Sequence, residues 1–496
     1  MSKTISPMLS ALAAALILAA CAAPEFKQPH VDVPAAFKES ANLQTASAQT
    51  AADGTRWQQA KPAEAQPRGE WWLAFGDPAL NQLIAEATAS NANLAVAAAR
   101  VKQARAIAGI AQADRVPQIG VSAGATRERE SPLALDLPQG TVVPPANVYQ
   151  ANLTASYEVD LFGRVASNVA AARSDEAASE AQYRSVLLSL QADVAQTYFR
   201  LRETDAELDT LNETVKLREE SVRVNQRRYD LGDLGEFDLA RAKTELATSR
   251  AEAVGLQQQR VTNEHALAVL LGKPASSFNA ERNPLKEGAA FPAIPAGLPS
   301  ALLERRPDIA IAQKNMEAAN ARIGVARAAM FPAINLNAGA GGMANTFPDV
   351  FQWSNRSWLL GALLNMPIID GGRNKANVER SKAALEESVA SYRQSTLTAF
   401  AEVEDNLAGL RILSGQAEQI DAAVVSARRS TQLAQQLYDA GRSSYLDLLD
   451  AQRNLATVQR NAVQLRGARA VTTVALIRSL GGGWDGAQPS VTVAQK

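Results

Sequence analysis

The chain repeats its own pattern at a fixed offset. A Gly-Arg pair at 163–164 returns at 372–373, and a Leu-Gly pair at 271–272 returns at 480–481, in both cases 209 residues later. Asp238 likewise returns as Asp447. Landmarks that keep one offset over most of a chain indicate a tandem duplication. We therefore predict two structural repeats at 71–272 and 301–484, a linker at 273–300 and a C-terminal tail at 485–496.

Each repeat is predicted to contain a helix, two extended segments and two very long helices. In the first repeat we expect helix over 78–114, with Asp77 as N-cap and Pro78 at the first helical position. The segment 164–229 contains no Pro or Gly and has apolar residues at every seventh position from 187, which is typical of a coiled coil. It would run roughly 100 Å as a helix. After a Gly-rich turn at 232–235 the chain is expected to return as helix to 271.

The second repeat predicts the same pair of long helices. We expect helix over 373–438, a turn at Gly441 and a returning helix that ends at 480. The apolar repeat at every seventh position, which we call the seam, is weaker in this stretch and has small residues at several of its positions. Small residues favour close packing between neighbouring helices.

The extended segments alternate between apolar and polar residues. Alternation is strict over 149–161 and similar over 118–129 and 334–340, whereas 357–369 is more uniformly apolar, with Trp353 and Trp358 near its start. Thirteen alternating residues are long enough to cross a bilayer as a tilted strand. A soluble four-stranded sheet explains the alternation equally well. Four strands cannot close a transmembrane barrel, so a membrane-spanning chain would have to oligomerise.

The N-terminus is expected to be an export signal. Lys3 precedes a short apolar run at 8–20, too short for a spanning helix, and residues 1–20 have the pattern of a secretory signal peptide. The sequence Leu-Ala-Ala-Cys at 18–21 resembles a bacterial lipobox, in which Cys21 becomes the lipidated N-terminus; the alternative is a plain signal peptide with an incidental cysteine. Residues 21–70 would form a lipidated arm. Ala22, by resemblance to sorted lipoproteins, favours the outer membrane.

The composition and the absence of known catalytic motifs argue against an enzyme, a metal site and a nucleic-acid-binding protein. Lys and Arg number 50 against 51 Asp and Glu, so the chain lacks the basic excess of a nucleic-acid-binding protein. One Cys and two His, His30 and His265, are too few for a thiolate cluster or a histidine-rich metal site. No P-loop, Gly-x-Ser-x-Gly or His-Glu-x-x-His motif is present. We expect no enzyme activity and no cofactor other than a covalent lipid on Cys21.

Several segments together resemble one family. Residues 302–309 (LLERRPDI) and 318–332 (AANARIGVARAAMFP) are similar to the most distinctive region of the TolC-type outer membrane factors, in the lipoprotein branch that serves resistance-nodulation-division pumps. Residues 71–78, 160–164 and 445–453 are similar to further signatures of this family. A periplasmic coiled-coil adaptor, the nearest alternative class, would share the long hairpins and the lipid but not the duplicated strands.

The resemblance implies an α+β membrane protein that works as a homotrimer. Each chain would supply four strands to a twelve-stranded β-barrel in the outer membrane, continuous with a long α-helical coiled-coil tunnel in the periplasm. A periplasmic membrane-fusion adaptor and an inner-membrane pump would dock at the far end. The implied function is the exit duct of a tripartite efflux system, passively conducting drugs or other small molecules. Protein secretion of type I and metal-ion efflux stay open as alternatives, although only six Met argue mildly against a copper conduit.

The resemblance also implies a gate at the two hairpin turns, which would form the periplasmic tip and open when the adaptor stabilises splayed hairpins. The candidate gate residues are Tyr438, Asp439, Arg442, Tyr445 and Asp447 in the second hairpin, with Asp230, Asp233, Glu236 and Asp238 in the first. The alternative is that these turns are helix breakers with solvated charges. Ser443 stands where some relatives are expected to carry a carboxylate, which argues against a carboxylate ring at that position.

Overall fold

The computed structural model describes residues 26–29, 33–34, 36–39, 70–287, 291–292, 294, 303 and 305–482. The predicted signal peptide, the lipobox with Cys21, and the tail at 485–496 lie outside these residues. The contacts divide the chain into two compact units, and each unit takes segments from both predicted repeats. The first comprises 1–30, 100–180 and 311–392; the second comprises 31–99, 181–310 and 393–496.

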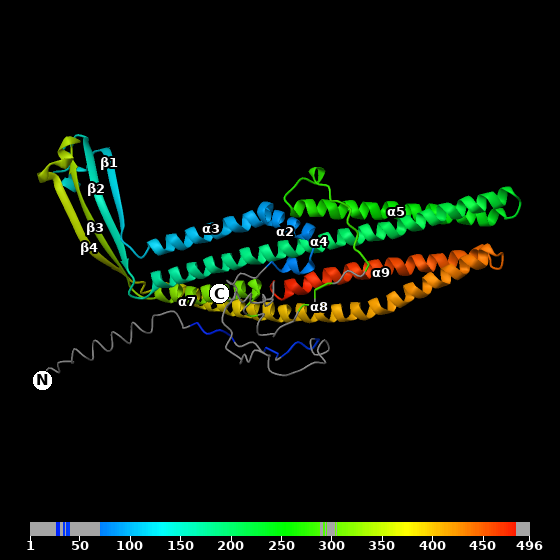
Figure 1. The fold of residues 1–496 in the computed structure, drawn as a ribbon. Helices are drawn as coiled ribbons and strands as arrows, with labels where there is room; N and C mark the ends of the chain where they lie inside the picture. The colour runs from blue at the N-terminus through cyan, green and yellow to red at the C-terminus, as the bar shows by residue number, and fades with distance from the viewer. Residues whose placement is uncertain are drawn as a thin grey trace, which may run out of the picture. The chain divides into compact units, whose positions relative to one another are not determined.

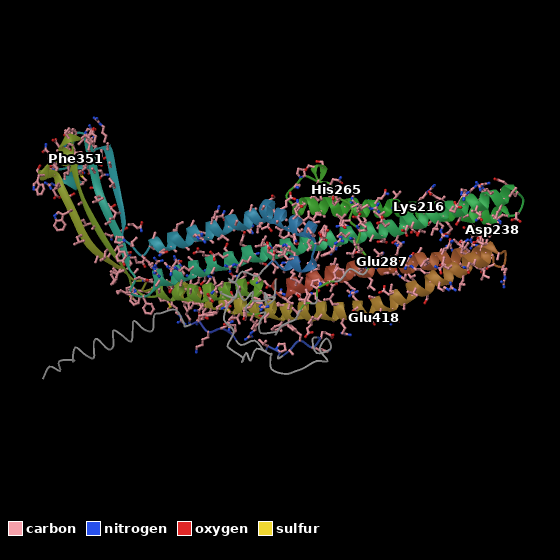
Figure 2. The ribbon with its side chains drawn as sticks, in the orientation of Figure 1. Lys216, Asp238, His265, Glu287, Phe351 and Glu418 are labelled. Carbon is pink, nitrogen blue, oxygen red and sulfur yellow. The ribbon has the colours of Figure 1, made fainter. Side chains whose placement is uncertain are left out.

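The first unit contains an antiparallel sheet of four strands in chain order (Figure 1). The strands are β1 (Gln118–Glu128), β2 (Ala146–Val159), β3 (Ala333–Ala344) and β4 (Arg356–Asn365). All four predicted strands are present. The fourth ends at Asn365 instead of 369, because Pro367 has no N–H to donate to a ladder. Short 3₁₀ helices at Pro132–Leu135, Pro348–Phe351 and Trp353–Asn355 lie in the connections from β1 to β2 and from β3 to β4. Exposed Phe351 lies at the end of the sheet where these connections are (Figure 2).

The register gives the sheet an apolar face and an opposite face that is polar except on β4, where exposed Leu359 and Leu363 lie. Ile119 on β1 is paired with Ala155, which is paired with Ala338, and Ala338 is paired with Leu360 on β4. Side chains alternate along a strand, so this row and the rows two residues away share a face. That face carries aliphatic and aromatic residues that are largely exposed. The opposite face is polar or glycine on β1 and on most of β2 and β3.

Carboxylates stabilise the two helices that follow the strands. Asp160 accepts hydrogen bonds from the backbone N–H groups of Val165 and Ala166 at 3.0 and 2.7 Å, at the start of α4 (Arg164–Asp230). Asp370 accepts from the N–H groups of Gly372 and Asn374, both at 2.9 Å, at the start of α8 (Arg373–Asp439). Each carboxylate satisfies N–H groups that have no partner within the helix.

The predicted single helix over 78–114 is wrong, because the structure has two helices there. These are α2 (Pro78–Ser90) and α3 (Ala92–Ala113), with Asn91 between them. The Asn91 side chain accepts a hydrogen bond from the Leu94 N–H at 3.0 Å and donates to the Leu270 carbonyl at 2.9 Å. Asn91 thereby caps α3 and ties it to a distant helix end. Asp77 and Pro78 start α2 as predicted.

The four long helices are confirmed close to their predicted bounds. α5 (Glu236–Leu270) follows α4, and α9 (Tyr445–Ser479) follows α8. α4 and α8 each have 67 residues, and α5 and α9 each have 35. Each pair forms a hairpin (Figure 1). Gly232 and Gly441 in the two turns have φ of 77° and 67°, a left-handed conformation that glycine adopts without strain.

The core of the second unit joins the two predicted repeats. Val194 and Leu201 of the α4 seam pack in one cluster with Trp71 and Trp72 and with Val474 of α9. Phe37, 1% exposed, packs in a second cluster on α8 and α9. α7 (Pro307–Ala328) is a further helix of the described residues. No helix within the described ranges is both long and apolar enough to cross a membrane.

One charged side chain of the motif at 302–309 is buried in this unit. Arg306 is 8% exposed and donates hydrogen bonds to Glu402 at 2.7 Å, to the Ser479 carbonyl at 2.9 Å and to Asp308 at 2.7 and 3.0 Å. A buried guanidinium is stable only when its N–H groups are satisfied in this way. Arg306 therefore fastens the start of α7 to α8 and to the end of α9.

Candidate functional site

The two hairpins meet at Tyr438, in the last turn of α8. Its hydroxyl accepts a hydrogen bond from Nη1 of Arg228 at 2.9 Å and donates to Oδ1 of Asn225 at 3.2 Å. The Arg228 guanidinium also lies over the Tyr438 ring, 5.4 Å from its centroid. Together with Tyr445, these residues form what we call the tip cluster: Asn225, Arg228, Tyr438 and Tyr445.

Tyr445 supplies the apolar part of the tip cluster. It is the first residue of α9, is 4% exposed, and packs against Ala242 of α5 and Leu449. Its ring centroid lies 5.9 Å from that of Tyr438. Burial raises the pKa of the Tyr445 phenol, and its hydroxyl has no hydrogen-bond partner in the described part of the chain. The buried Nδ2 of Asn225 also lacks a partner there. The tip cluster thus joins α4, α8 and α9 and, through Ala242, also contacts α5. Two of its buried donors, the Tyr445 hydroxyl and Nδ2 of Asn225, make no hydrogen bond in the described part of the chain.

Two arginines reinforce the contact between the hairpins. Arg218 on α4 is 3% exposed and donates from Nη1 to Oε1 of Gln452 on α9 at 2.6 Å. Burial lowers the pKa of the Arg218 guanidinium. Arg453, next on α9, forms a bidentate ion pair with Glu245 on α5, with Nε to Oε2 at 3.0 Å. Arg453 holds the pKa of the Glu245 carboxyl below its usual range.

Asp230 and Asp439 occupy equivalent places at the ends of the two outgoing helices. Asp230 accepts a hydrogen bond from the Gln226 side chain at 2.9 Å, and Asp439 accepts one from Gln435 at the same distance. Both carboxylates are exposed. Each is held by a glutamine of its own helix, and neither contacts the tip cluster through a hydrogen bond or an ion pair in the described structure.

Asp447 caps α9. Its carboxylate accepts from the backbone N–H of Ser444 at 3.0 Å and from the Ser444 hydroxyl at 2.8 Å, and the Ser444 oxygen accepts from the Asp447 N–H at 3.2 Å. This is a capping box, and the hydrogen bonds from Ser444 lower the pKa of the Asp447 carboxyl. In the first hairpin Gly235 occupies the N-cap position and supplies no side-chain bond.

The remaining candidates lie around the turns. Asp233 is exposed and accepts from Nε of Arg228 at 3.1 Å. Glu236 and Asp238 lie in the first turn of α5, where carboxylates are favoured by the helix dipole (Figure 2). Arg442 is exposed, and its guanidinium has no hydrogen bond or ion pair with another described residue.

The structure therefore brings only Tyr438 and Tyr445, of the nine candidates, into one packed cluster. Sequence reasoning missed Asn225, Arg228 and Arg218, which form the α4 side of the junction. The sequence marks Arg228 only as the second of two adjacent arginines near a turn. The hydrogen bonds of the tip cluster join an arginine, an amide and a phenol. They do not form the pair of coupled titrating groups that an acid–base catalyst uses.

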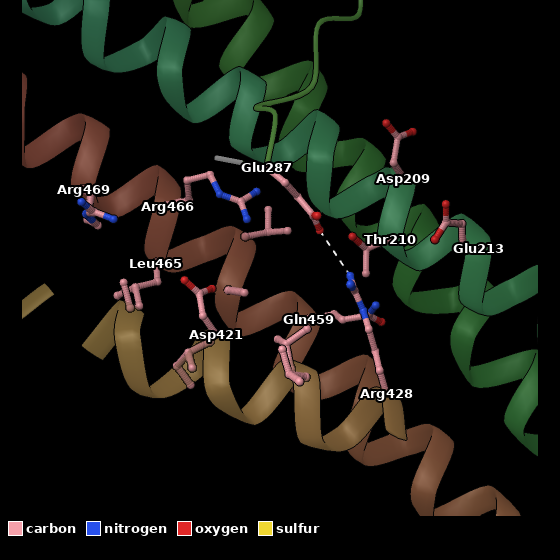
Figure 3. Close-up of a pocket in the computed structure, with 16 residues that line it drawn as sticks. Asp209, Thr210, Glu213, Glu287, Asp421, Arg428, Gln459, Leu465, Arg466 and Arg469 are labelled. Carbon is pink, nitrogen blue, oxygen red and sulfur yellow. Dashed lines mark hydrogen bonds and ion pairs between the residues drawn. The ribbon is translucent and has the colours of Figure 1, made fainter. Parts of the chain in front are cut away.

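A crevice of about 480 Å³ lies further along the helices, between α4, α8 and α9 (Figure 3). Arg428, Arg466 and Arg469 line it together with Asp421 and Glu213. Arg428 forms a 3.5 Å ion pair with Glu287, and both side chains are largely solvent-exposed. Such mixed, hydrated charges are typical of a coiled-coil surface. Among the described residues, no group of three or more His, Cys, Asp or Glu side chains could hold a metal ion.

Comparison with known proteins identifies the family. The model of the family described as "Outer membrane efflux protein" matches residues 83–273 and 298–482. This chain belongs to that family. Among its relatives is the probable efflux pump outer membrane protein TtgC of Pseudomonas putida, 34% identical over 481 residues, which are 96% of each chain. The probable outer membrane lipoprotein SilC of Salmonella typhimurium is 32% identical and covers 96% of this chain and 98% of its own length.

Solved structures of outer membrane efflux proteins share this fold. The outer-membrane channel OprN aligns with a TM-score of 0.82 and 27% identity over 94% of this chain and 99% of its own. The open-state MtrE channel of Neisseria gonorrhoeae aligns with a TM-score of 0.78 and 28% identity over 93% and 98%. The chain is thus an outer membrane efflux protein and acts as an exit duct. The mostly helical fold with a four-stranded sheet is the fold of these channels.

Proposed function

We propose that three copies of this chain close a twelve-stranded barrel in the outer membrane, continuous with a tunnel built from the long helices. The observation that carries the proposal is the sheet itself. β1 and β4 are edge strands of an antiparallel sheet with an exposed apolar face, and an even number of strands lets β4 of one copy pair antiparallel with β1 of the next. Closure would satisfy both edges, as a lipid environment requires.

Each of the two predicted repeats would form half of one copy's share of this duct. Corresponding long helices have equal lengths, and the family model matches the chain twice, once in each predicted repeat. Each repeat would supply two strands and one helical hairpin to the wall of the tunnel. The linker at 273–300 and the tail at 485–496 would lie outside this repeated unit.

Cys21 is our candidate for lipid attachment. It ends the lipobox-like sequence and is the only cysteine in the chain. The relative SilC is named as a probable outer membrane lipoprotein, which is consistent with this assignment. Covalent acyl chains at Cys21 would anchor the N-terminal arm to the outer membrane, with the barrel as the second attachment.

The hairpin turns would form the closed end of the duct. In the closed state Asp439, Arg442 and the first-hairpin carboxylates Asp230, Asp233 and Glu236 would contact neighbouring copies, since they are exposed within one copy. The half-buried Asp238 would contribute from the first turn of α5. The tip cluster would hold the two hairpins of each copy together, with Asp447 keeping the start of α9 in place. A periplasmic adaptor that binds splayed hairpins better than closed ones would shift this equilibrium toward the open state.

The partners follow from the class of protein. Relatives are named as components of efflux pumps, including a toluene efflux pump outer membrane protein of Pseudomonas putida and the pyoverdine export protein OpmQ of Pseudomonas aeruginosa. We propose that this chain works with an inner-membrane resistance-nodulation-division pump and a membrane-fusion adaptor, and conducts drugs or other small molecules. A passive duct does not have to select its cargo, so the pump would set the substrate range.

The proposal is tested by mass and labelling. Full-length chain purified in detergent should have the native mass of three copies, and growth with a radiolabelled fatty acid should label it. Cys21→Ala should abolish the label. A monomer under all detergent conditions would contradict the duct, and label retained by Cys21→Ala would contradict the anchor.

A further inference from the structure

The connection between β3 and β4 folds back onto the apolar face of the sheet, which we call the outward face because it would contact lipid in the proposed barrel. Gly342 lies on this face in register with Ala151, and a Cβ added there would overlap the carbonyl of Val350 in the connection. Val350 is buried, and Phe347 packs edge-on against Tyr149 of β2, with ring centroids 6.2 Å apart. The connection is therefore held on the lipid side of the sheet.

This end of the sheet gathers exposed aromatic side chains. Phe347, Phe351 and Trp353 of the connection are largely exposed, and so is Trp358, which lies on the outward face of β4 (Figure 2). Exposed aromatic rings next to an apolar band are typical of the boundary between lipid and water. We therefore place this boundary at the level of the connection.

The charges of the outward face have a single sign. Among the residues of the four strands, the charged side chains on this face are Arg127 and Arg356, and both lie near the end where the connections are. The strand carboxylates Glu128 and Glu158 lie on the opposite face, because side chains alternate along a strand. The outward face thus carries positive charge that no carboxylate of the same face balances.

The length of β4 places Arg356 at the edge of the apolar band. From Arg356 to Leu364 the strand covers about 27 Å, which is about 21 Å of depth at a tilt of about 40°. An apolar band in such a barrel is about 25 Å tall, so Arg356 and Leu364 lie near its two borders. The opposite end of the sheet continues into the long helices of the proposed tunnel (Figure 1). Arg356 would therefore lie at the level of the headgroups of the outer leaflet.

Arg356 is positioned by an aromatic ring and not by a carboxylate. Its guanidinium lies over the ring of Trp353, and it forms no hydrogen bond or ion pair with another described residue. Asp349, the one carboxylate of the connection, instead accepts hydrogen bonds from the side chains of Thr346 and Gln352. Stacking covers one face of the guanidinium and leaves its N–H groups, which point outward in the plane, free to bind an anion.

We propose that Arg356, stacked on Trp353 and flanked by Trp358, binds the phosphate of a phosphorylated lipid in the outer leaflet. A planar guanidinium matches a phosphate group with two parallel hydrogen bonds, and the charge is stronger at a lipid boundary than in water. The exposed rings of the connection would pack against the sugar and the first methylene groups of the lipid. This inference rests on the proposed barrel and assigns a lipid site separate from the covalent lipid at Cys21.

The test measures lipid retained by the full-length chain. Wild type and variants are reconstituted in phosphatidylcholine nanodiscs that contain either diphosphorylated lipid A or its dephosphorylated form, and native mass spectrometry measures the fraction of trimers that keep the added lipid. Wild type should retain the phosphorylated form preferentially. Arg356→Gln should retain roughly fivefold less of it, because one charged, bidentate contact is lost. Trp353→Ala should show a similar loss, and Trp353→Phe, which keeps a ring under the guanidinium, a smaller one.

The matched control is Arg115→Gln, an exposed arginine before the opposite end of β1, which should retain lipid as wild type does. Equal retention of both forms of lipid A, or unchanged retention in Arg356→Gln trimers, would overturn the lipid site and leave the trimer standing. Displacement of lipid A by excess inorganic phosphate would assign the site to a soluble anion and would also overturn it. Chains that stay monomeric would overturn both this site and the proposed function.

Discussion

Arg228 on α4 donates a hydrogen bond to the Tyr438 hydroxyl on α8 at 2.9 Å and covers the face of the same ring. This pair joins the two helical hairpins of one copy near their turns. Hydrogen bonds to a charged donor are stronger than neutral ones, and a cation over an aromatic ring adds further attraction. Movement of one hairpin relative to the other therefore has to break this pair.

Tyr438→Phe should weaken the closed state. The variant loses the hydrogen bonds to Arg228 and Asn225 but keeps the ring that packs near Tyr445. A loss of about 1 kcal/mol is expected, which corresponds to a several-fold larger open fraction. Single-channel recording should show more frequent opening.

The matched control for this variant is Tyr229→Phe. Tyr229 is the equivalent residue in the first predicted repeat, and it is 41% exposed. Its hydroxyl makes no hydrogen bond to the tip cluster in the described part of the chain, so the control should behave as wild type. Equal opening in Tyr438→Phe and wild type would remove the tip cluster from gating.

Asp439→Ala and Arg442→Ala should each raise the closed-state conductance. Both side chains are exposed in one copy, and Arg442 has no ionic partner among the described residues, which leaves both groups available to a neighbouring copy. Removing either would open the ring of contacts between hairpins. Unchanged closed-state conductance in both variants would show that these residues lie outside the gate.

Gly467→Ala should destabilise the protein. Gly467 of α9 is buried, and a Cβ there would overlap the Glu203 carboxylate on α4. The Glu203 side chain can shift and Ala is favoured over Gly inside a helix by about 0.5–1 kcal/mol, so we expect a net loss of about 1 kcal/mol, measured as a lower thermal midpoint. The double variant with Glu203→Ala should recover much of the loss. A double variant no more stable than Gly467→Ala would show that the overlap is not the cause.

Glu203 should also make stability depend on pH. Burial, followed by the neighbouring Glu207, raises the pKa of Glu203 from 4.5 to about 7. The folded chain then binds more protons than the unfolded chain between these values, so stability falls as pH rises from about 4.5 to about 7 and is constant beyond. Glu203→Gln should raise the thermal midpoint at pH 8 and flatten this part of the profile.

The size of this effect is limited by solvent. Glu203 keeps partial solvent contact, so we expect roughly 1–2 kcal/mol at pH 8. Glu213→Gln, an exposed residue of the same helix, is the control and should leave the profile unchanged. A profile that is identical for wild type and Glu203→Gln would contradict the assignment.

The long helices were predictable because their limits are local. A long stretch free of Pro and Gly specifies α4, and a stretch free of Pro at the same offset in the second repeat specifies α8. The glycines at 232 and 441 end them with positive φ. The strands were predictable because alternation fixes their faces. The break at Asn91 was not predictable, since the side chain that caps α3 also bonds to Leu270, 179 residues away.

The candidate site was only partly predictable for the same reason. The turns and Tyr438 follow from the duplication and the family resemblance. Arg228, Asn225 and Arg218 contribute through contacts between hairpins more than two hundred residues apart in the chain, and no local pattern distinguishes them from the many solvated charges on these helices. Asp447 was predicted at the gate, and the structure shows its helix-capping role.

Electrical recording tests the central claim most directly. Purified full-length chain is added to a planar lipid bilayer, and single-channel currents are measured for wild type and for Asp439→Ala. The duct predicts discrete steps of low conductance in wild type and larger or longer openings in the variant. A trimeric, folded preparation that produces no discrete steps in either protein would contradict it.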